Sequence, residues 1–154
     1  MNLEIFSKRL KELMEMEGES IRSLSIKIGV DRTSIRYWLK GIYSPKYDAL
    51  IKLSAFFNVS ADYLVGLEEN MDSAASFKGS KEISAAEISE KFVKQLSAYM
   101  TEKNLTIYAM SKELDIDQKA FTKWLRNGSM PSVAVLIKLA RLMHVPLHTL
   151  LGKE

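Results

Sequence analysis

The sequence repeats itself once, at an offset of 86 residues (Trp124 against Trp38) and without a gap. The run Leu-Ile-Lys-Leu at 50–53 recurs unchanged at 136–139. Other positions with the same residue in both copies are Phe6 and Phe92, Leu10 and Leu96, Ile21 and Ile107, Asp31 and Asp117, Leu39 and Leu125, Pro45 and Pro131, Val59 and Val145, Leu64 and Leu150, and Gly66 and Gly152. A correspondence over roughly sixty residues indicates an internal duplication. The two halves must therefore share one fold.

Apolar residues in the first copy recur at the spacing of amphipathic helices. The pattern predicts a helix over 3–16 that Gly18 ends, two short helices within 21–41, a helix that begins at Pro45, and a last short helix that Ser60 caps and Gly66 ends. No segment has the alternation of a strand. The fold class is therefore all-α, with about five helices in each copy.

The two short helices within 21–41 are predicted to meet at Gly29. Glycine takes the positive φ of a sharp turn without a Cβ clash. Asp31 stands where an N-cap belongs, so its carboxylate can accept from the first amides of the second helix. In the second copy Asp115 takes the position of Gly29, and aspartate visits the left-handed region more readily than most residues.

Residues 68–82 differ in character from the rest of the chain, because they are rich in charged residues, serine and glycine. This composition predicts a polar linker. Ser84 and Glu87 then form a capping-box pattern that opens a new helix. The predicted organisation is a domain at 1–67, a linker at 68–82 and a second domain at 83–154.

The second helix of the pair has one apolar side, with Ile35, Trp38 and Leu39, and one polar side. A short helix that is anchored in this way and presents arginine, threonine and tyrosine suits the DNA major groove. The bland alternative is a solvated basic face, but the turn before it and the second copy both favour the DNA interpretation. The polar side contains Arg32, Thr33, Arg36, Tyr37 and Lys40 in the first copy, and Gln118, Lys119, Thr122, Lys123 and Arg126 in the second.

Composition sets wider limits. A net charge of +3 is too small to argue for nucleic acid, so the placement of the charges matters more. The chain has no cysteine, no early apolar run of a signal peptide and no uninterrupted apolar stretch that could span a membrane, so a cytoplasmic protein is expected. No phosphate-binding glycine loop or hydrolytic triad is apparent, so the chain is not expected to be an enzyme. No cofactor or metal is expected either, because Pro146 separates His144 from His148.

The run from Leu24 to Trp38, followed by Lys40-Gly41, Pro45 and the apolar segment 50–59, resembles the lambda-repressor-like helix-turn-helix family, the Xre/Cro class of bacterial and phage regulators. The resemblance covers about residues 6–66 and, more loosely, 92–152. It implies two tandem five-helix DNA-binding domains and a transcriptional regulator that acts as a repressor. By position it implies base contacts from Arg32, Thr33 and Tyr37, and phosphate contacts from Ser20, Arg22, Arg36 and Lys40.

The sequence departs from that family at Leu39 and Leu125, where glutamate is common, and this predicts local repacking. Double-stranded DNA is the expected partner. A second copy of the chain or a regulatory protein is left open as a further partner. The alternative function is a protein-interaction or dimerisation module in which the second domain pairs chains or binds a protein, with Phe56 and Leu142 as candidate apolar edges.

Overall fold

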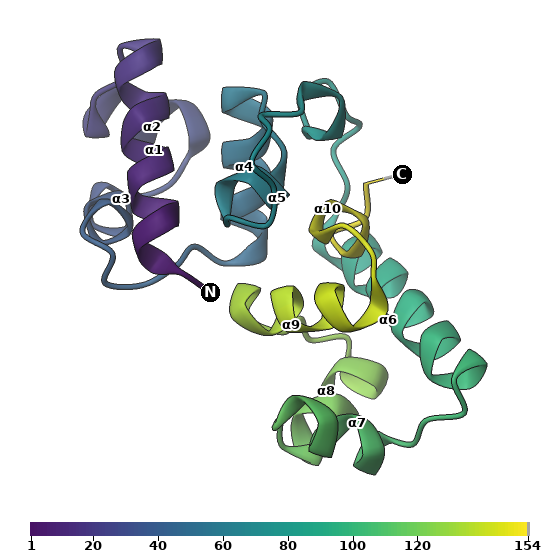
Figure 1. The fold of residues 1–154 in the computed structure, drawn as a ribbon. Coiled ribbons are helices and arrows are strands. Elements are labelled where there is room, and N and C mark those ends of the chain that lie inside the picture. The colour runs from purple at the N-terminus through teal and green to yellow at the C-terminus, as the bar shows by residue number, and fades with distance from the viewer. Residues whose placement is uncertain (154) are drawn as a thin grey trace. The chain divides into compact units, whose positions relative to one another are not determined.

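The computed structural model describes residues 1–153, and every regular element within them is a helix (Figure 1). The chain divides into two compact units, Met1–Ser80 and Lys81–Glu154. Each unit contains five α-helices, which confirms the predicted all-α fold class. None of the helices in the described part of the chain is long and apolar enough to cross a membrane.

The first unit is built around a long first helix. Its elements are α1 (Leu3–Glu17), α2 (Ile21–Ile28), α3 (Arg32–Leu39), α4 (Tyr47–Phe57) and α5 (Ala61–Leu64). Helix α1 packs against α3 and α5, while α2 packs against α3 and α4. Phe6 is fully buried and meets the edge of Trp38 at a centroid distance of 6.5 Å. This contact fixes α3 against α1.

Three predicted helix ends are confirmed by the backbone. Gly18 and Gly29 take left-handed φ values of 66° and 69° after α1 and α2. Ser60 Oγ accepts from the Tyr63 amide at 2.9 Å and so caps α5. Each of these residues satisfies a backbone group that the helix end would otherwise leave unpaired.

The predicted start of the fourth helix is wrong by two residues. Helix α4 begins at Tyr47, after an extended Lys46 that provides no side-chain cap. Pro45 is buried outside the helix instead of occupying its first position. In the second unit Ser132 follows the matched proline and caps α9 (Val133–Met143), with Oγ accepting from the Val135 amide at 3.3 Å. The first copy has Lys46 at that position, so its helix lacks the cap that would have marked its start.

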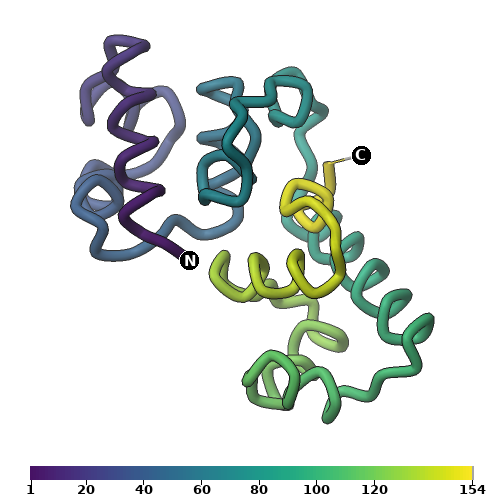
Figure 2. The backbone as a smooth tube through the Cα atoms, in the orientation of Figure 1, coloured from purple at the N-terminus to yellow at the C-terminus, as the bar shows by residue number. Residues whose placement is uncertain are grey.

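The chain after α5 is more ordered than its polar composition predicts. Before α6 (Ala85–Glu102) this segment forms a further turn (Figures 1 and 2). The turn includes a short 3-10 helix at Ser73–Ala75. The Phe77 side chain is buried, and its amide donates to Ser54 Oγ at 3.1 Å. Ser76 Oγ donates to Asn58 Oδ1 at 2.7 Å. The segment up to Ser80 therefore belongs to the first unit, and an open linker over all of 68–82 does not describe it.

The second unit repeats the arrangement with α6 (Ala85–Glu102), α7 (Ile107–Leu114), α8 (Gln118–Asn127), α9 (Val133–Met143) and α10 (Leu147–Leu150). Phe92 and Trp124 make the same edge contact, at 6.4 Å. Ser84 Oγ accepts from the Glu87 amide at 3.2 Å, which is the first of the two bonds of the predicted capping box.

The turns of the second unit keep their backbone geometry although their residues differ. Asp115 has φ 53° where the first copy has Gly29, as predicted, and Asn104 has φ 55° where it has Gly18. Asparagine and aspartate are the side chains that best tolerate this region. The third helix of each unit differs more, because α8 has ten residues and α3 has eight.

Candidate nucleic-acid interface

Helix α3 presents one exposed polar face to solvent, and the N-cap orients its first turn. Asp31 Oδ1 accepts from the Ser34 amide at 2.8 Å. The Ser34 hydroxyl also donates to this carboxylate, to Oδ2 at 2.9 Å. The bond from the amide, followed by that from the hydroxyl, holds the pKa of Asp31 below its ordinary value, so the cap is charged at neutral pH. Ile35 and Trp38 are buried on the inner side. The structure places five predicted site residues together on the outer side, and we call them the α3 face: Arg32, Thr33, Arg36, Tyr37 and Lys40.

The cations of the α3 face are available to a ligand. Within residues 1–153, the side chains of Arg32, Arg36 and Lys40 make no hydrogen bond or ion pair with the protein, and neither does Arg22 at the start of α2. Phosphate oxygens are natural partners for such groups. The basic face is therefore free to bind an anion.

Two other cations of the first unit are already engaged in holding the fold together. Arg9 lies over the Tyr63 ring at 4.2 Å and donates to the Glu68 carbonyl at 2.9 Å. Lys27 Nζ lies 2.5 Å from Glu19 Oε1. These two residues are structural, which distinguishes them from the four unpaired cations beside α3.

Ser20 lies at the N-terminus of α2, as the phosphate-contact prediction requires, but its side chain also has a structural role. Its Oγ accepts from the Ser23 amide at 3.0 Å, and Ser23 Oγ accepts from the Ser20 amide at 2.9 Å. This reciprocal capping box pairs two backbone amides at the start of α2. The dipole of the helix favours an anion at the same end.

The sequence pattern did not identify one residue that lies beside the α3 face. Tyr43 lies after α3, and its ring meets the Tyr37 ring edge-on at 5.3 Å. Its hydroxyl is 3.5 Å from Ser34 Oγ. The sequence signal that could have identified Tyr43 is the pair of large residues Ile42-Tyr43 in a segment with the composition of a turn. Both side chains are exposed in the structure. Tyr43 therefore braces Tyr37, one of the predicted base-reading side chains.

Helix α8 presents a related face in the second unit, and we call its predicted residues the α8 face: Gln118, Lys119, Thr122, Lys123 and Arg126. Four of them are exposed. Thr122 is half-buried, and its Oγ1 donates back to the Gln118 carbonyl at 3.2 Å. Thr122 is therefore turned toward its own helix and is the least accessible of the five.

The flank of the α8 face also differs from that of the α3 face. Tyr108 takes the position of Arg22 and is 55% exposed. Lys112 Nζ lies 5.1 Å from the centre of the Tyr108 ring. An aromatic residue thus replaces a free cation at the start of the neighbouring helix.

The two histidines do not share a helix. His144 ends α9 in the left-handed conformation, with φ 56°, and Pro146 caps α10, which contains His148. The prediction that Pro146 separates them is therefore confirmed, although the proline is the N-cap and not the first helical residue.

Comparison with known proteins bears directly on this geometry. A family model described as helix-turn-helix matches residues 10–64 and again residues 96–150, one match in each unit. The chain belongs to the helix-turn-helix family. Each match runs from the first helix of a unit to its fifth, so α3 and α8 are the second helices of two tandem helix-turn-helix pairs. Helix-turn-helix domains are binding modules, and this membership is the evidence for the predicted non-enzymatic assignment.

Two relatives of this helix-turn-helix chain come from Bacillus subtilis (strain 168). HTH-type transcriptional regulator ImmR is 34% identical over 62 residues, which are 40% of this chain and 49% of the relative. Uncharacterized HTH-type transcriptional regulator YobD is 28% identical over 78 residues, which are 51% of this chain and 70% of the relative. The chain thus spans about half the length of the first relative. No solved structure matches it.

Proposed function

We propose that this helix-turn-helix chain is a sequence-specific DNA-binding transcriptional regulator that reads the major groove with α3. The observation that carries the proposal is the α3 face, where Arg32, Arg36 and Lys40 are exposed and unpaired within the described residues. Both relatives are HTH-type transcriptional regulators by name, and this supports the same function.

The proposed contacts divide by position on the helix pair. Arg32, Thr33 and Tyr37 read bases, because they stand at the exposed N-terminal and central part of α3. Arginine pairs with guanine in bidentate geometry, and apolar or aromatic groups meet the thymine methyl. The proposed phosphate contacts are Ser20, Arg22, Arg36 and Lys40, which flank that position. Phosphate contacts set orientation, while base contacts set sequence preference.

The second unit is proposed to bind DNA through the α8 face. Lys119, Lys123 and Arg126 supply its positive charge, and Gln118 can make bidentate contact with adenine. Two linked DNA-binding units raise the local concentration of the second after the first has bound. The regulatory output that follows is repression, since a chain occupying two neighbouring sites can block a promoter.

The alternative assigns the second unit to pairing of chains or to a protein partner. The observations that favour it are the half-buried Thr122 and the replacement of Arg22 by the exposed Tyr108. Both changes reduce the number of groups that are available to DNA.

Footprinting of the full chain on DNA selected from a random pool tests the proposal. Simultaneous replacement of Lys119, Lys123 and Arg126 by Ala is expected to shorten the footprint and weaken binding. A reporter gene with the selected site in its promoter should be silenced by the wild-type chain and less so by this variant. An unchanged footprint and affinity, with chain pairing lost only when the second unit is deleted, would establish the alternative.

A further inference from the structure

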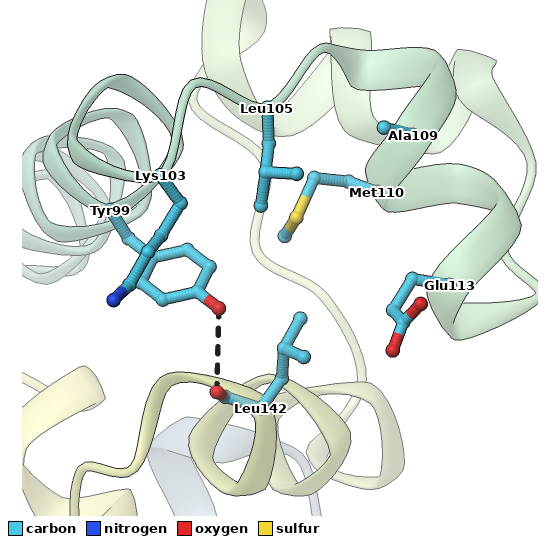
Figure 3. Close-up of a pocket in the computed structure, with 7 residues that line it drawn as sticks. All are labelled: Tyr99, Lys103, Leu105, Ala109, Met110, Glu113 and Leu142. Carbon is cyan, nitrogen blue, oxygen red and sulfur yellow. Dashed lines mark hydrogen bonds between the residues drawn. The ribbon is translucent and has the colours of Figure 1, made fainter.

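The second unit contains a pocket with a volume of about 370 Å³ between the end of α6, helix α7 and the end of α9 (Figure 3). Leu105, Met110 and Leu142 point into it from three different segments. The α8 face takes no part in it. Its lining residues are Tyr99, Lys103, Leu105, Ala109, Met110, Glu113 and Leu142.

The matched positions of the first unit hold different side chains. Phe56 stands at the position of Leu142, and Glu19 and Lys27 stand at the positions of Leu105 and Glu113. In the first unit Lys27 pairs with Glu19 at 2.5 Å and lies 5.8 Å from the centre of the Phe56 ring. The second unit has a leucine in place of Glu19 and another in place of the larger Phe56. The lining of the pocket thus differs from the matched residues of the first unit.

The pocket combines an apolar interior with two opposite charges. Tyr99 Oη donates to the Leu142 carbonyl at 3.4 Å, so its ring forms a fixed wall. Lys103 and Glu113 lie on opposite sides of the apolar interior (Figure 3). Neither side chain forms an ion pair within residues 1–153. Because the two charges are separated, one molecule can reach both only if its own charges are separated as well.

We propose that this pocket binds a small organic molecule with an unbranched apolar body, an anionic group at one end and a cationic group at the other. The apolar body covers Leu105, Met110 and Leu142 and removes their surface from water. The anionic end meets the Lys103 ammonium, and the cationic end meets the Glu113 carboxylate. A volume of about 370 Å³ falls in the range of small-molecule sites.

The test uses the full chain and a series of unbranched ω-amino acids of increasing length, with the monocarboxylates, monoamines and dicarboxylates of the same lengths as matched probes. Methyl resonances of Ala109, Met110 and Leu142 report binding by NMR. One ω-amino acid is expected to shift these resonances in a saturable way and to bind more tightly than its matched probes. The exposed charges make each charge contact modest, so Lys103→Gln and Glu113→Gln should each weaken binding about two- to five-fold.

Two further variants decide between this site and a passive gap. Leu142→Phe introduces the larger side chain that stands at the matched position of the first unit, and it should abolish the saturable shifts. Glu113→Lys introduces the matched charge, and it should change the preferred probe from the ω-amino acid to the dicarboxylate of equal length. Its exposed position lets this variant fold even if Leu142→Phe does not.

Several results would overturn the proposal. Saturable binding that persists at equal strength in a folded Leu142→Phe protein would place the probe elsewhere. The absence of saturable shifts with every probe would also refute it, as would an unchanged probe preference in Glu113→Lys. A protein segment that shifts the same resonances while no small probe does would assign the pocket to a protein partner instead.

Discussion

The two units are copies of one helical fold that have diverged at two places. The first place is the outer face of the second helix of each helix-turn-helix pair, and the other is the region beside the first helix of that pair. Within the described residues, the first unit has four cations at α3 and the start of α2 without a protein partner, and its Glu19–Lys27 pair lies beside the Phe56 ring. The second has a longer α8, a half-buried Thr122 on its outer face, and a pocket beside α7. The aromatic contact between the first and third helices of each unit is preserved, at 6.5 and 6.4 Å.

This difference shows which residues hold the fold and which are free to change. Residues that set the backbone have been kept or replaced by residues that take the same backbone conformation. Ser25 Oγ donates to the Val30 carbonyl at 2.5 Å, and Ser111 Oγ donates to the Ile116 carbonyl at 2.6 Å. Residues on the outer helix face and around the pocket have changed type. The divergence therefore lies on the exposed face of the third helix of each unit and in the lining of the pocket.

The largest effects are expected from the two tryptophans. Trp38→Ala and Trp124→Ala should each lower the free energy of unfolding by roughly 3–5 kcal/mol, because each removes a large buried side chain. Each loss should fall on its own unit. Thermal unfolding of the full chain, followed by NMR signals from each unit, measures this. Equal destabilisation of both units by one variant would contradict two separately folded domains.

Trp38→Phe separates the packing of this side chain from its polarity. Trp38 Nε1 is buried without a hydrogen-bond partner in the described structure. Phenylalanine would keep an aromatic contact with Phe6 and remove the unpaired donor, whose burial is unfavourable. Trp38→Phe should therefore cost clearly less stability than Trp38→Ala. An equal cost would mean that the indole N–H has a partner in solution.

The reading faces should differ in the sequence information that they carry. If Arg32 pairs with guanine, Arg32→Ala should cost about 1–3 kcal/mol on the selected site and relax preference at one base pair. Lys40→Ala should weaken binding to all sequences alike and lower the salt slope by about one. Binding measured on the selected site and on single-base variants, at several salt concentrations, checks both. Equal, sequence-independent losses would assign Arg32 to the phosphate backbone.

A smaller effect is expected from acid, and it should follow the Glu19–Lys27 pair. The hydrogen bond from Lys27, followed by that from Ser23, holds the pKa of Glu19 below its ordinary value of 4.5. A lowered pKa in the folded state stabilises the protein above the ordinary value, and this stabilisation is lost as the pH falls below it. Glu19→Gln should therefore flatten the acid side of the first unit's stability profile, as should Lys27→Gln. An unchanged profile in both variants would show that the pair does not stabilise the fold.

Most of the fold could be predicted from the sequence, because the repeat shows each helical pattern in two independent copies. Four residues mark helix ends, and the structure confirms them. Gly18 and Gly29 end helices by their left-handed conformation, and Asp31 and Ser60 cap helix starts. The start of α4 was mispredicted, because Pro45 fits the first helical position by type while the fold buries it before the helix. The order of residues 72–77 was also missed, because Phe77 is a single apolar residue in a polar segment and its bond to Ser54 spans 23 positions.

The candidate site was predicted less completely than the fold. Helical periodicity placed the α3 and α8 residues on exposed faces, but it could not show which cations have partners inside the protein. The bracing of Tyr37 by Tyr43 depends on a turn whose path the sequence does not specify. The lining of the pocket beside α7 includes positions 105, 113 and 142, which differ from their matched residues in the first unit and lie on separate segments. Only the folded chain brings those three differences together.

The most direct test is the affinity of the full chain for its selected DNA after Arg32, Thr33, Arg36 and Tyr37 are all replaced by Ala. The matched control is Lys8→Ala with Lys11→Ala, which removes two exposed positive charges from α1. If α3 reads the groove, the first variant should lose specific binding and keep only weak, salt-dependent association, while the control retains sequence preference. Undiminished specific affinity in the folded α3 variant would contradict the assignment of the α3 face to DNA reading.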